Sequence, residues 1–327
     1  MVAFVAGLLI TAATLADIFS TILVPGPTRG GIHLGPRIRR AIMPVARRLP
    51  RAASGHRSNA FAPLIFLLVF AGWMLLLLFG FGLIFLAFGN HFAPRLGGFD
   101  DALYFAGSSL LTLGVSEVDA HGPARWLLLT AGISGFAVIT ATLTFVIQVQ
   151  SALHQRESRV LTLASLAGTP PTGIGILQAV AHLDVASELH DFFRIWRDWA
   201  AAMLHSHLAS PMLIFFHSVD RESDWLQSLE ATLDAATMLM ALTEHEARGA
   251  ATLMHRAGSR TAARLCDLLG VAAQEPPPIG PAEIEALIGR LAESSYPVRR
   301  DHEALATFAR LRADYAGRIA ALAAELA

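Results

Sequence analysis

The stretch DALYFAGSSLLTLGVSEV, residues 101–118, decides how the rest of this chain is organised. Its first part, 101–111, has the apolar spacing of a short amphipathic helix, and a Thr-x-Gly-x-small segment follows directly. Apolar runs long enough to cross a bilayer stand on both sides, at 60–89 and 126–150. Non-helical backbone at membrane depth is tolerated only where it is buried in protein or lines a water-filled cavity. The sequence therefore predicts a re-entrant loop made of a short helix and an extended segment.

In this order and spacing, residues 61–150 resemble the pore domain of the potassium-channel superfamily, with outer helix, pore helix, filter and inner helix in turn. The family's filter reads Thr-Val-Gly-Tyr-Gly, usually followed by Asp, and its backbone carbonyls replace the hydration shell of the ion. Thr112 and Gly114 are identical to the family's residues, and Leu113 replaces Val conservatively. Ala-Leu-Tyr-Phe at 102–105 and Ala-Gly-Ile at 131–133 also look like the family, so the resemblance covers roughly a quarter of the 327 residues.

The chain departs from the family's pattern at Val115, Ser116 and Glu117, which stand for Tyr, Gly and Asp. Filter glycines allow backbone angles that residues with a Cβ adopt only at a cost, so Ser116 should alter the outermost ion site. The Tyr ring, which braces the filter in the family, is absent at Val115. The resemblance implies a cation channel that conducts potassium, with a weakly selective channel that also carries sodium as the alternative. It implies an ion-binding filter, made of Thr112, Leu113, Gly114, Val115 and Ser116. The carboxylate of Glu117, which directly follows, either faces the pore entrance or forms hydrogen bonds behind the filter.

The run 126–150 carries a stripe of small and polar residues along one helix face, at four-residue steps: Gly132, Phe136, Thr140, Thr144 and Gln148. Such a stripe suits either tight helix packing or a hydrated cavity, and the pore topology favours the cavity. Gly132 or Gly135 is a candidate hinge, although glycine also permits close packing. Gln148 lies near the cytoplasmic end, where four copies would form a constriction.

A further apolar run, 2–24, predicts a membrane helix within residues 1–25. A secretory signal carries positive charge before its apolar core, and none precedes this run. The stretch 26–59 holds eight arginines and no acid, and short Arg-rich loops stay in the cytoplasm. We therefore expect a multi-pass protein of the cell membrane, with its N-terminus outside, the pore loop entered from outside and all residues after 150 in the cytoplasm. A segment within the linker, 38–49, could also bind anionic lipid at the inner leaflet, but plain topology control is the simpler account.

Acidic residues in and near the apolar runs have two interpretations each. Asp17 is the one acid within the run 2–24, and an ionisable group there is by default a functional hypothesis. The alternative, which we favour, is that Asp17 reaches headgroup water or pairs with a linker arginine. Asp100 and Asp101 either raise the cation concentration at a pore mouth or are ordinary solvated loop charges.

Residues 151–327 predict an all-helical cytosolic domain, in which 151–166 continues the inner helix. Gly-Thr-Pro-Pro at 168–171 ends that helix, and the segment QEPPPIGP at 274–281 reads as a stiff linker whose Gly280 and Pro281 begin the next helix. The apolar periodicity predicts further helices at 185–208, 211–217, 225–245, 247–269, 282–293 and 299–326.

Several function classes are excluded or disfavoured. Gly-Ile-Gly at 173–175 lacks a preceding strand and a third glycine, which argues against a dinucleotide-binding unit. His205 with His207, and His245 between two glutamates, could bind metal or sense pH, but neither spacing places like residues on one helix face, so solvated or helix-end histidines are preferred. The single cysteine excludes a Cys-rich metal site, and the net charge of −1 gives no basic field for nucleic acid. No nucleophile and base have catalytic spacing, so we expect no enzyme and no cofactor beyond permeating cations.

The whole sequence predicts an all-α membrane protein with three transmembrane helices, a re-entrant pore helix and filter within 60–150, and a helical cytosolic domain that gates the inner helix. Only one pore loop is visible, and a filter of this type needs four loops around an axis, so the resemblance implies a homotetramer. The rival from another class is a non-conducting membrane scaffold or signalling protein with a degenerate pore.

Overall fold

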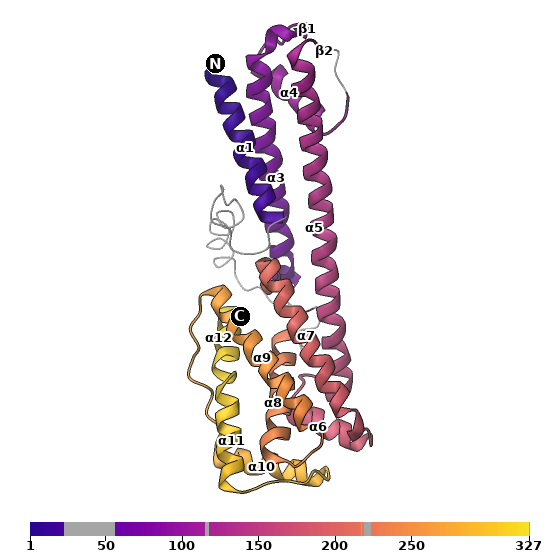
Figure 1. The fold of residues 1–327 in the computed structure, drawn as a ribbon, viewed down its shortest axis with the longest axis vertical. Helices are drawn as coiled ribbons and strands as arrows, with labels where there is room; N and C mark the ends of the chain where they lie inside the picture. The colour runs from indigo at the N-terminus through magenta and orange to yellow at the C-terminus, as the bar shows by residue number, and fades with distance from the viewer. Residues whose placement is uncertain (23–55, 115–117, 217, 219–223, 327) are drawn as a thin grey trace. The chain divides into compact units, whose positions relative to one another are not determined.

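The computed structural model describes residues 1–22, 56–114, 118–216, 218 and 224–326 (Figure 1), with the side chains of 56–66 and 212 outside the description. The all-α prediction is confirmed, because the described part of the chain is mostly helical and has almost no strand. Within these residues, three helices are long and apolar enough to cross a membrane: Val2–Ile22, Leu67–Ala87 and Pro123–Ala167. The Arg-rich linker up to residue 55, including the segment 38–49, lies outside the described residues. The chain forms two compact units, Met1–Val149 and Gln150–Ala327.

The first unit contains a two-stranded sheet and the helices that the sequence predicts around residues 101–118. Its elements are α1 (Val2–Ile22), α3 (His56–Ala87), η1 (Gly89–His91), β1 (Phe92–Ala93), α4 (Phe99–Leu110), β2 (Asp119–Ala120) and the first part of α5 (Pro123–Ala167). Helix α5 is continuous over both units, as predicted for the inner helix and its extension. It ends where Gly168 takes a left-handed φ of 81°, a conformation that glycine adopts without strain.

Small residues let α1 and α3 approach closely. A Cβ added to Gly7 would lie 2.5 Å from the carbonyl oxygen of Gly80, and a Cβ on Gly80 would lie 2.4 Å from Oγ1 of Thr11. Helices in a bilayer gain little from hydrophobic burial, since lipid is as apolar as leucine, so close backbone packing is what holds them together. The pair α1–α3 is therefore a tightly packed scaffold for the elements that follow.

Asp17 lies on the same buried face of α1. Its side chain is fully buried, and the indole Nε1–H of Trp73 on α3 donates a hydrogen bond of 2.9 Å to its Oδ2. The expectation that Asp17 reaches headgroup water is wrong, because the small residues Gly7 and Thr11 turn this face of α1 onto α3. Its pairing with a linker arginine concerns residues outside the description.

Replacing Trp73 with Phe should destabilise the first unit, because the ring is kept while the hydrogen bond to a buried carboxylate is lost. Losing one partner of a hydrogen bond to a buried group costs about 1–3 kcal/mol. Thermal unfolding in detergent micelles should show a lower Tm for Trp73→Phe. Trp126→Phe is the matched control, since Trp126 is 74% exposed and its replacement should leave the Tm nearly unchanged. Equal losses in both variants would contradict the role given to the Asp17–Trp73 contact.

The second unit is a helical bundle built around one buried helix. Its elements are α6 (Gly173–His182), η2 (Ala186–Glu188), α7 (Leu189–Ala209), η3 (Pro211–Phe215), α8 (Trp225–Leu242), α9 (Arg248–Leu269), α10 (Pro281–Glu293), α11 (His302–Ala313) and α12 (Ala316–Leu326). Nearly every residue of α8 is buried, and α6, α7, α9, α11 and α12 pack against it (Figure 1). A helix that is buried on nearly all sides belongs in the middle of a bundle.

The structure differs from the sequence prediction at two places in this unit. Helix α6 was not predicted: Thr172 caps it by accepting a hydrogen bond from the amide of Gly175, so Gly-Ile-Gly opens a helix. The helix predicted over 299–326 is instead two helices, α11 and α12, which meet at Tyr315. Tyr315 is fully buried there, and its hydroxyl donates a hydrogen bond to Asp234 of α8. By contrast, the non-helical linker is confirmed at 271–280, and α10 begins at Pro281 after Gly280.

A second buried polar group of this unit is His207 on α7, which is 1% exposed. Burial lowers the pKa of His207 to about 4; the nearby charge of Arg156 lowers it as well, whereas the hydrogen bond with the carbonyl oxygen of Met203, 2.7 Å from Nδ1, acts in the opposite direction. His207 is therefore neutral in the folded protein at neutral pH.

The stability of the second unit should fall as the pH drops from above 6.5 toward 4. In that window the unfolded chain protonates His207 and the folded chain does not, so the unfolded state binds more protons. At 1.36 kcal/mol per pH unit, the loss amounts to about 3 kcal/mol at most. The test is the difference in free energy of unfolding between the native chain and His207→Gln, followed by tryptophan fluorescence at several pH values. A difference that does not change with pH would contradict the buried neutral histidine.

Candidate functional site

The short helix α4 is held against α3 by a cluster of aromatic rings. The ring of Phe105 packs edge-on against Phe85 and Phe92, with centroids 5.4 and 5.1 Å apart. The other buried apolar residues of α4, which are Ala102, Ala106 and Leu110, recur at helical spacing, so the prediction of an amphipathic helix is confirmed. Leu103 lies next to Gly82, where an added Cβ would come within 2.9 Å of its Cδ2. Helix α4 is thus fixed at several points along its length.

At the start of α4, the carboxylate of Asp101 turns back onto the preceding loop. Its Oδ2 accepts a hydrogen bond of 2.7 Å from the amide of Gly97. Both Asp100 and Asp101 are exposed in the first turn, where acidic side chains are favoured by the positive end of the helix dipole. Asp101 therefore orders this loop locally. The two interpretations from the sequence, a charge at a pore mouth and a solvated loop charge, both stay open.

The chain leaves α4 through a left-handed turn at the position predicted for the filter. The amides of Thr112 and Leu113 donate to the carbonyl oxygens of Ser109 and Ser108, at 3.1 and 2.9 Å. Thr112 and Gly114 then have φ values of 54° and 64°, and residues 113 and 114 have no helical structure. Leu113 is 62% exposed, and a Cβ added to Gly114 would meet nothing within 4 Å. The described part of the predicted filter is non-helical and is left uncovered by its own chain. Val115, Ser116 and Glu117 lie outside the described residues.

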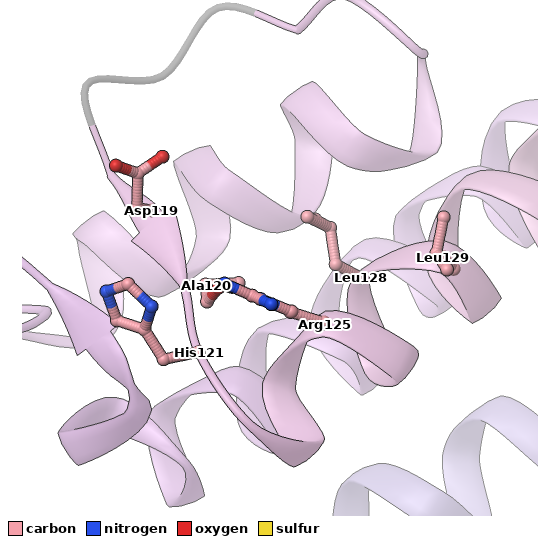
Figure 2. Close-up of a pocket in the computed structure, with 6 residues that line it drawn as sticks. All are labelled: Asp119, Ala120, His121, Arg125, Leu128 and Leu129. Atoms are coloured by element: carbon pink, nitrogen blue, oxygen red, sulfur yellow. Dashed lines mark hydrogen bonds between the residues drawn. The ribbon is translucent and has the colours of Figure 1, made fainter.

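The chain on both sides of this segment is joined by a small antiparallel pairing. Phe92 of β1 pairs with Ala120 of β2, and the amide of His121 donates to the carbonyl oxygen of His91 at 2.8 Å. Arg125 reinforces this contact, since its Nε–H donates to the carbonyl oxygen of Ala120 at 2.9 Å. Figure 2 shows the residues that line a hollow beside β2. They come from β2, from the connection after it and from the first turns of α5: Asp119, Ala120, His121, Arg125, Leu128 and Leu129. The sheet thus holds the start and the end of the 94–118 segment together.

Helix α5 touches the end of α4 through a glycine. A Cβ added to Gly135 would lie 1.9 Å from the carbonyl oxygen of Leu110, whereas one added to Gly132 would lie at an ordinary 3.6 Å from that of Ser109. Ser134 and Val138 are buried beside Gly135. For Gly135 the structure supports close packing, one of the two interpretations that the sequence left open.

The polar stripe on α5 faces away from these contacts. Thr140, Thr144 and Gln148 are exposed, and the hydroxyl of Thr144 donates to the carbonyl oxygen of Thr140 at 3.0 Å. Phe136 on the same stripe is 65% exposed. Among the described residues, the segment 112–114 is exposed, and so are Phe136, Thr140, Thr144 and Gln148 of the stripe. Gly135, also named for the cavity, is instead buried against α4, and Gly132 is half-buried.

The histidine pairs considered as metal or proton sites are not brought together. His205 is exposed while His207 is buried, and the Nδ1 of His245 accepts a hydrogen bond from the amide of Ala247. Within the described ranges, no group of three or more His, Cys, Asp or Glu side chains could hold a metal ion. Three buried contacts were not predicted from the sequence. They are the contact of Trp73 with Asp17, that of Gly135 with the carbonyl group of Leu110, and that of the Arg156 guanidinium with the carbonyl oxygens of Leu213 and Phe216. An indole opposite a membrane acid is the one signal that could have indicated the first.

Gly135→Ala should destabilise the protein more than Gly132→Ala. The methyl group at 135 overlaps the backbone of Leu110, so the helices must separate, and such overpacking costs about 1–3 kcal/mol. At 132 the methyl group fits, and alanine also favours the helix. Thermal unfolding of both variants in detergent measures the difference. Equal or inverted effects would mean that α5 does not pack on α4 at Gly135.

Comparison of the chain with protein-family models, with curated proteins and with solved structures gave no match.

Proposed function

We propose that this chain is one subunit of a homotetrameric cation channel that conducts potassium through a filter at residues 112–116. The observation that carries the proposal is the end of α4: the helix stops at Leu110, and the chain continues as an uncovered, non-helical segment with left-handed Thr112 and Gly114. This segment lies in sequence between two helices long enough to cross a membrane. The family resemblance supports the same assignment.

The physical argument is that backbone N–H and C=O groups within a membrane need hydrogen-bond partners. Peptide N–H and C=O groups outside a helix cannot face lipid, because an unpaired group costs several kcal/mol there. The surroundings of Leu113 and Gly114 must therefore come from water, from other copies of the chain or from permeating ions. Four copies around an axis supply all three, and carbonyl oxygens then replace the water around a dehydrated cation. Potassium is the proposed ion, and sodium passes as well if Val115 and Ser116 relax the geometry.

The proposed roles of α5, Glu117, the Arg-rich linker and the second unit follow from the proposed position of the filter. The exposed stripe Thr140, Thr144 and Gln148 lines the cavity below the filter, and Glu117 stands at its entrance. The arginines of residues 26–59 keep that linker at the cytoplasmic face, so the N-terminus is outside and Gln150–Ala327 is in the cytoplasm. That helical unit gates the pore through the continuous helix α5.

Purified protein in liposomes should pass potassium faster than sodium, as measured by flux of each ion under a gradient. No flux of either ion would favour a non-conducting scaffold, and equal flux of both would remove selectivity.

Gly114→Ala should reduce the potassium flux, because a residue with a Cβ is strained by about 1–2 kcal/mol in the left-handed conformation. If that strain falls on the conducting state, the flux drops about tenfold. Gly89→Ala is the matched control, since Gly89 has no positive φ and an added Cβ meets its nearest neighbour at 4.0 Å. Unchanged flux in Gly114→Ala would contradict the position of the filter.

A further inference from the structure

Arginine is rarely buried in proteins unless it is paired, and Arg156 of α5 is 4% exposed. It lies in the part of α5 that belongs to the second unit. Its Nη2 donates to the carbonyl oxygen of Phe216 at 2.7 Å, and its Nη1 donates to that of Leu213 at 3.3 Å. One guanidinium therefore holds the end of η3, using the fork of donors that only arginine offers.

Two further contacts involve this guanidinium. Its Nε donates to Oε1 of Glu157 at 2.8 Å, so the buried charge has an acidic partner. The guanidinium carbon lies 5.5 Å from the ring centroid of Trp225, the first residue of α8, which is within the range of a cation–π contact. The positive charge of Arg156 thus links α5 to η3 and to α8.

The backbone of the same residue contacts a third element. The indole Nε1–H of Trp199 on α7 donates to the carbonyl oxygen of Arg156 at 3.3 Å. One and two turns further along α5, Val160 and Leu163 are buried in the core of the bundle. Within the second unit, α5 is therefore attached by Arg156 and by this apolar face.

The exposed side of α5 offers an internal comparison. Arg159 lies three residues further along the same helix and is exposed. Both residues carry the same charge in the same helix, so only the buried contacts distinguish them.

We infer that Arg156 is the positioning residue through which the second unit sets the state of α5, and this inference rests on the proposed channel function. Helix α5 is unbroken from Pro123 to Ala167, so Gln148 lies about 12 Å from Arg156 along its axis at 1.5 Å per residue. A rearrangement of η3, α7 or α8 pulls on the guanidinium, and the rigid helix carries the displacement to the constriction at Gln148. Arg156 does not touch the ion path, so it affects gating and leaves permeation alone.

The test uses the full chain with Arg156→Lys, Arg156→Met and the control Arg159→Met. Lysine keeps the charge but lacks the planar fork of donors with which the guanidinium reaches both carbonyl oxygens, and methionine removes the charge while keeping an apolar stem. In single-channel recordings from liposomes, both Arg156 variants should change the open probability by about fivefold or more, with the lysine variant closer to the native chain. The unitary conductance and the potassium-to-sodium ratio should stay as in the native chain, and Arg159→Met should behave like the native chain throughout.

Amide hydrogen exchange of residues 150–163 in detergent provides a readout that needs no current. Exchange there should be faster in the Arg156 variants than in Arg159→Met. A native open probability with native exchange overturns the inference, and so does a changed conductance or ion ratio, which would place Arg156 in the ion path. If the native chain carries no current at all, the proposed function fails and the gating role fails with it. If the native chain conducts and the Arg156 variants keep both its current and its exchange rates, only the role of Arg156 is rejected. Arg156→Lys keeps the test open if the methionine variant does not fold.

Discussion

The backbone contact between Gly135 and Leu110 is the constraint on which the first unit depends. The end of α4 needs a firm support, because the residues after it leave the helix and turn left-handed at Thr112 and Gly114. Only a residue without a side chain lets α5 come this close to the carbonyl of Leu110. The aromatic cluster of Phe85, Phe92 and Phe105 secures α4 from the other side. The segment proposed to bind ions therefore begins from a fixed helix end.

Buried polar contacts fix the helices in both units. Asp17 accepts from Trp73 between α1 and α3, and Asp234 accepts from Tyr315 between α8 and the junction of α11 with α12. Arg156 joins α5 to η3 and α8 in the same manner. Apolar side chains slide over one another at little cost, whereas a buried charged or polar group is stable only with its partner in place. These three contacts therefore help to fix the register of the helices that they join.

A gating mechanism needs one part that is rigid and one that can change. Helix α5 is suited to the first role, because it is continuous from Pro123 to Ala167 and the regular hydrogen bonds of an α-helix stiffen its backbone. The elements that contact Arg156 are suited to the role of the part that can change, since η3 is a short 3-10 segment and Trp225 is the first residue of α8. A buried arginine between them transmits force well, because separation from its carbonyl partners leaves charged and polar groups unsatisfied.

The sequence by itself determined the helical class, the three membrane-length runs, the short amphipathic helix before Thr112 and the helix start at Pro281. Each of these follows from apolar periodicity, run length or the fixed chemistry of Gly and Pro, which act within a few residues. Only the tertiary structure decided that Asp17 is buried against Trp73, that Gly135 serves packing, that the last predicted helix breaks at Tyr315 and that Arg156 is enclosed while Arg159 is not. These outcomes depend on residues 25 to 81 positions away in the chain, and local pattern carries no information about which distant side chain fills a given space.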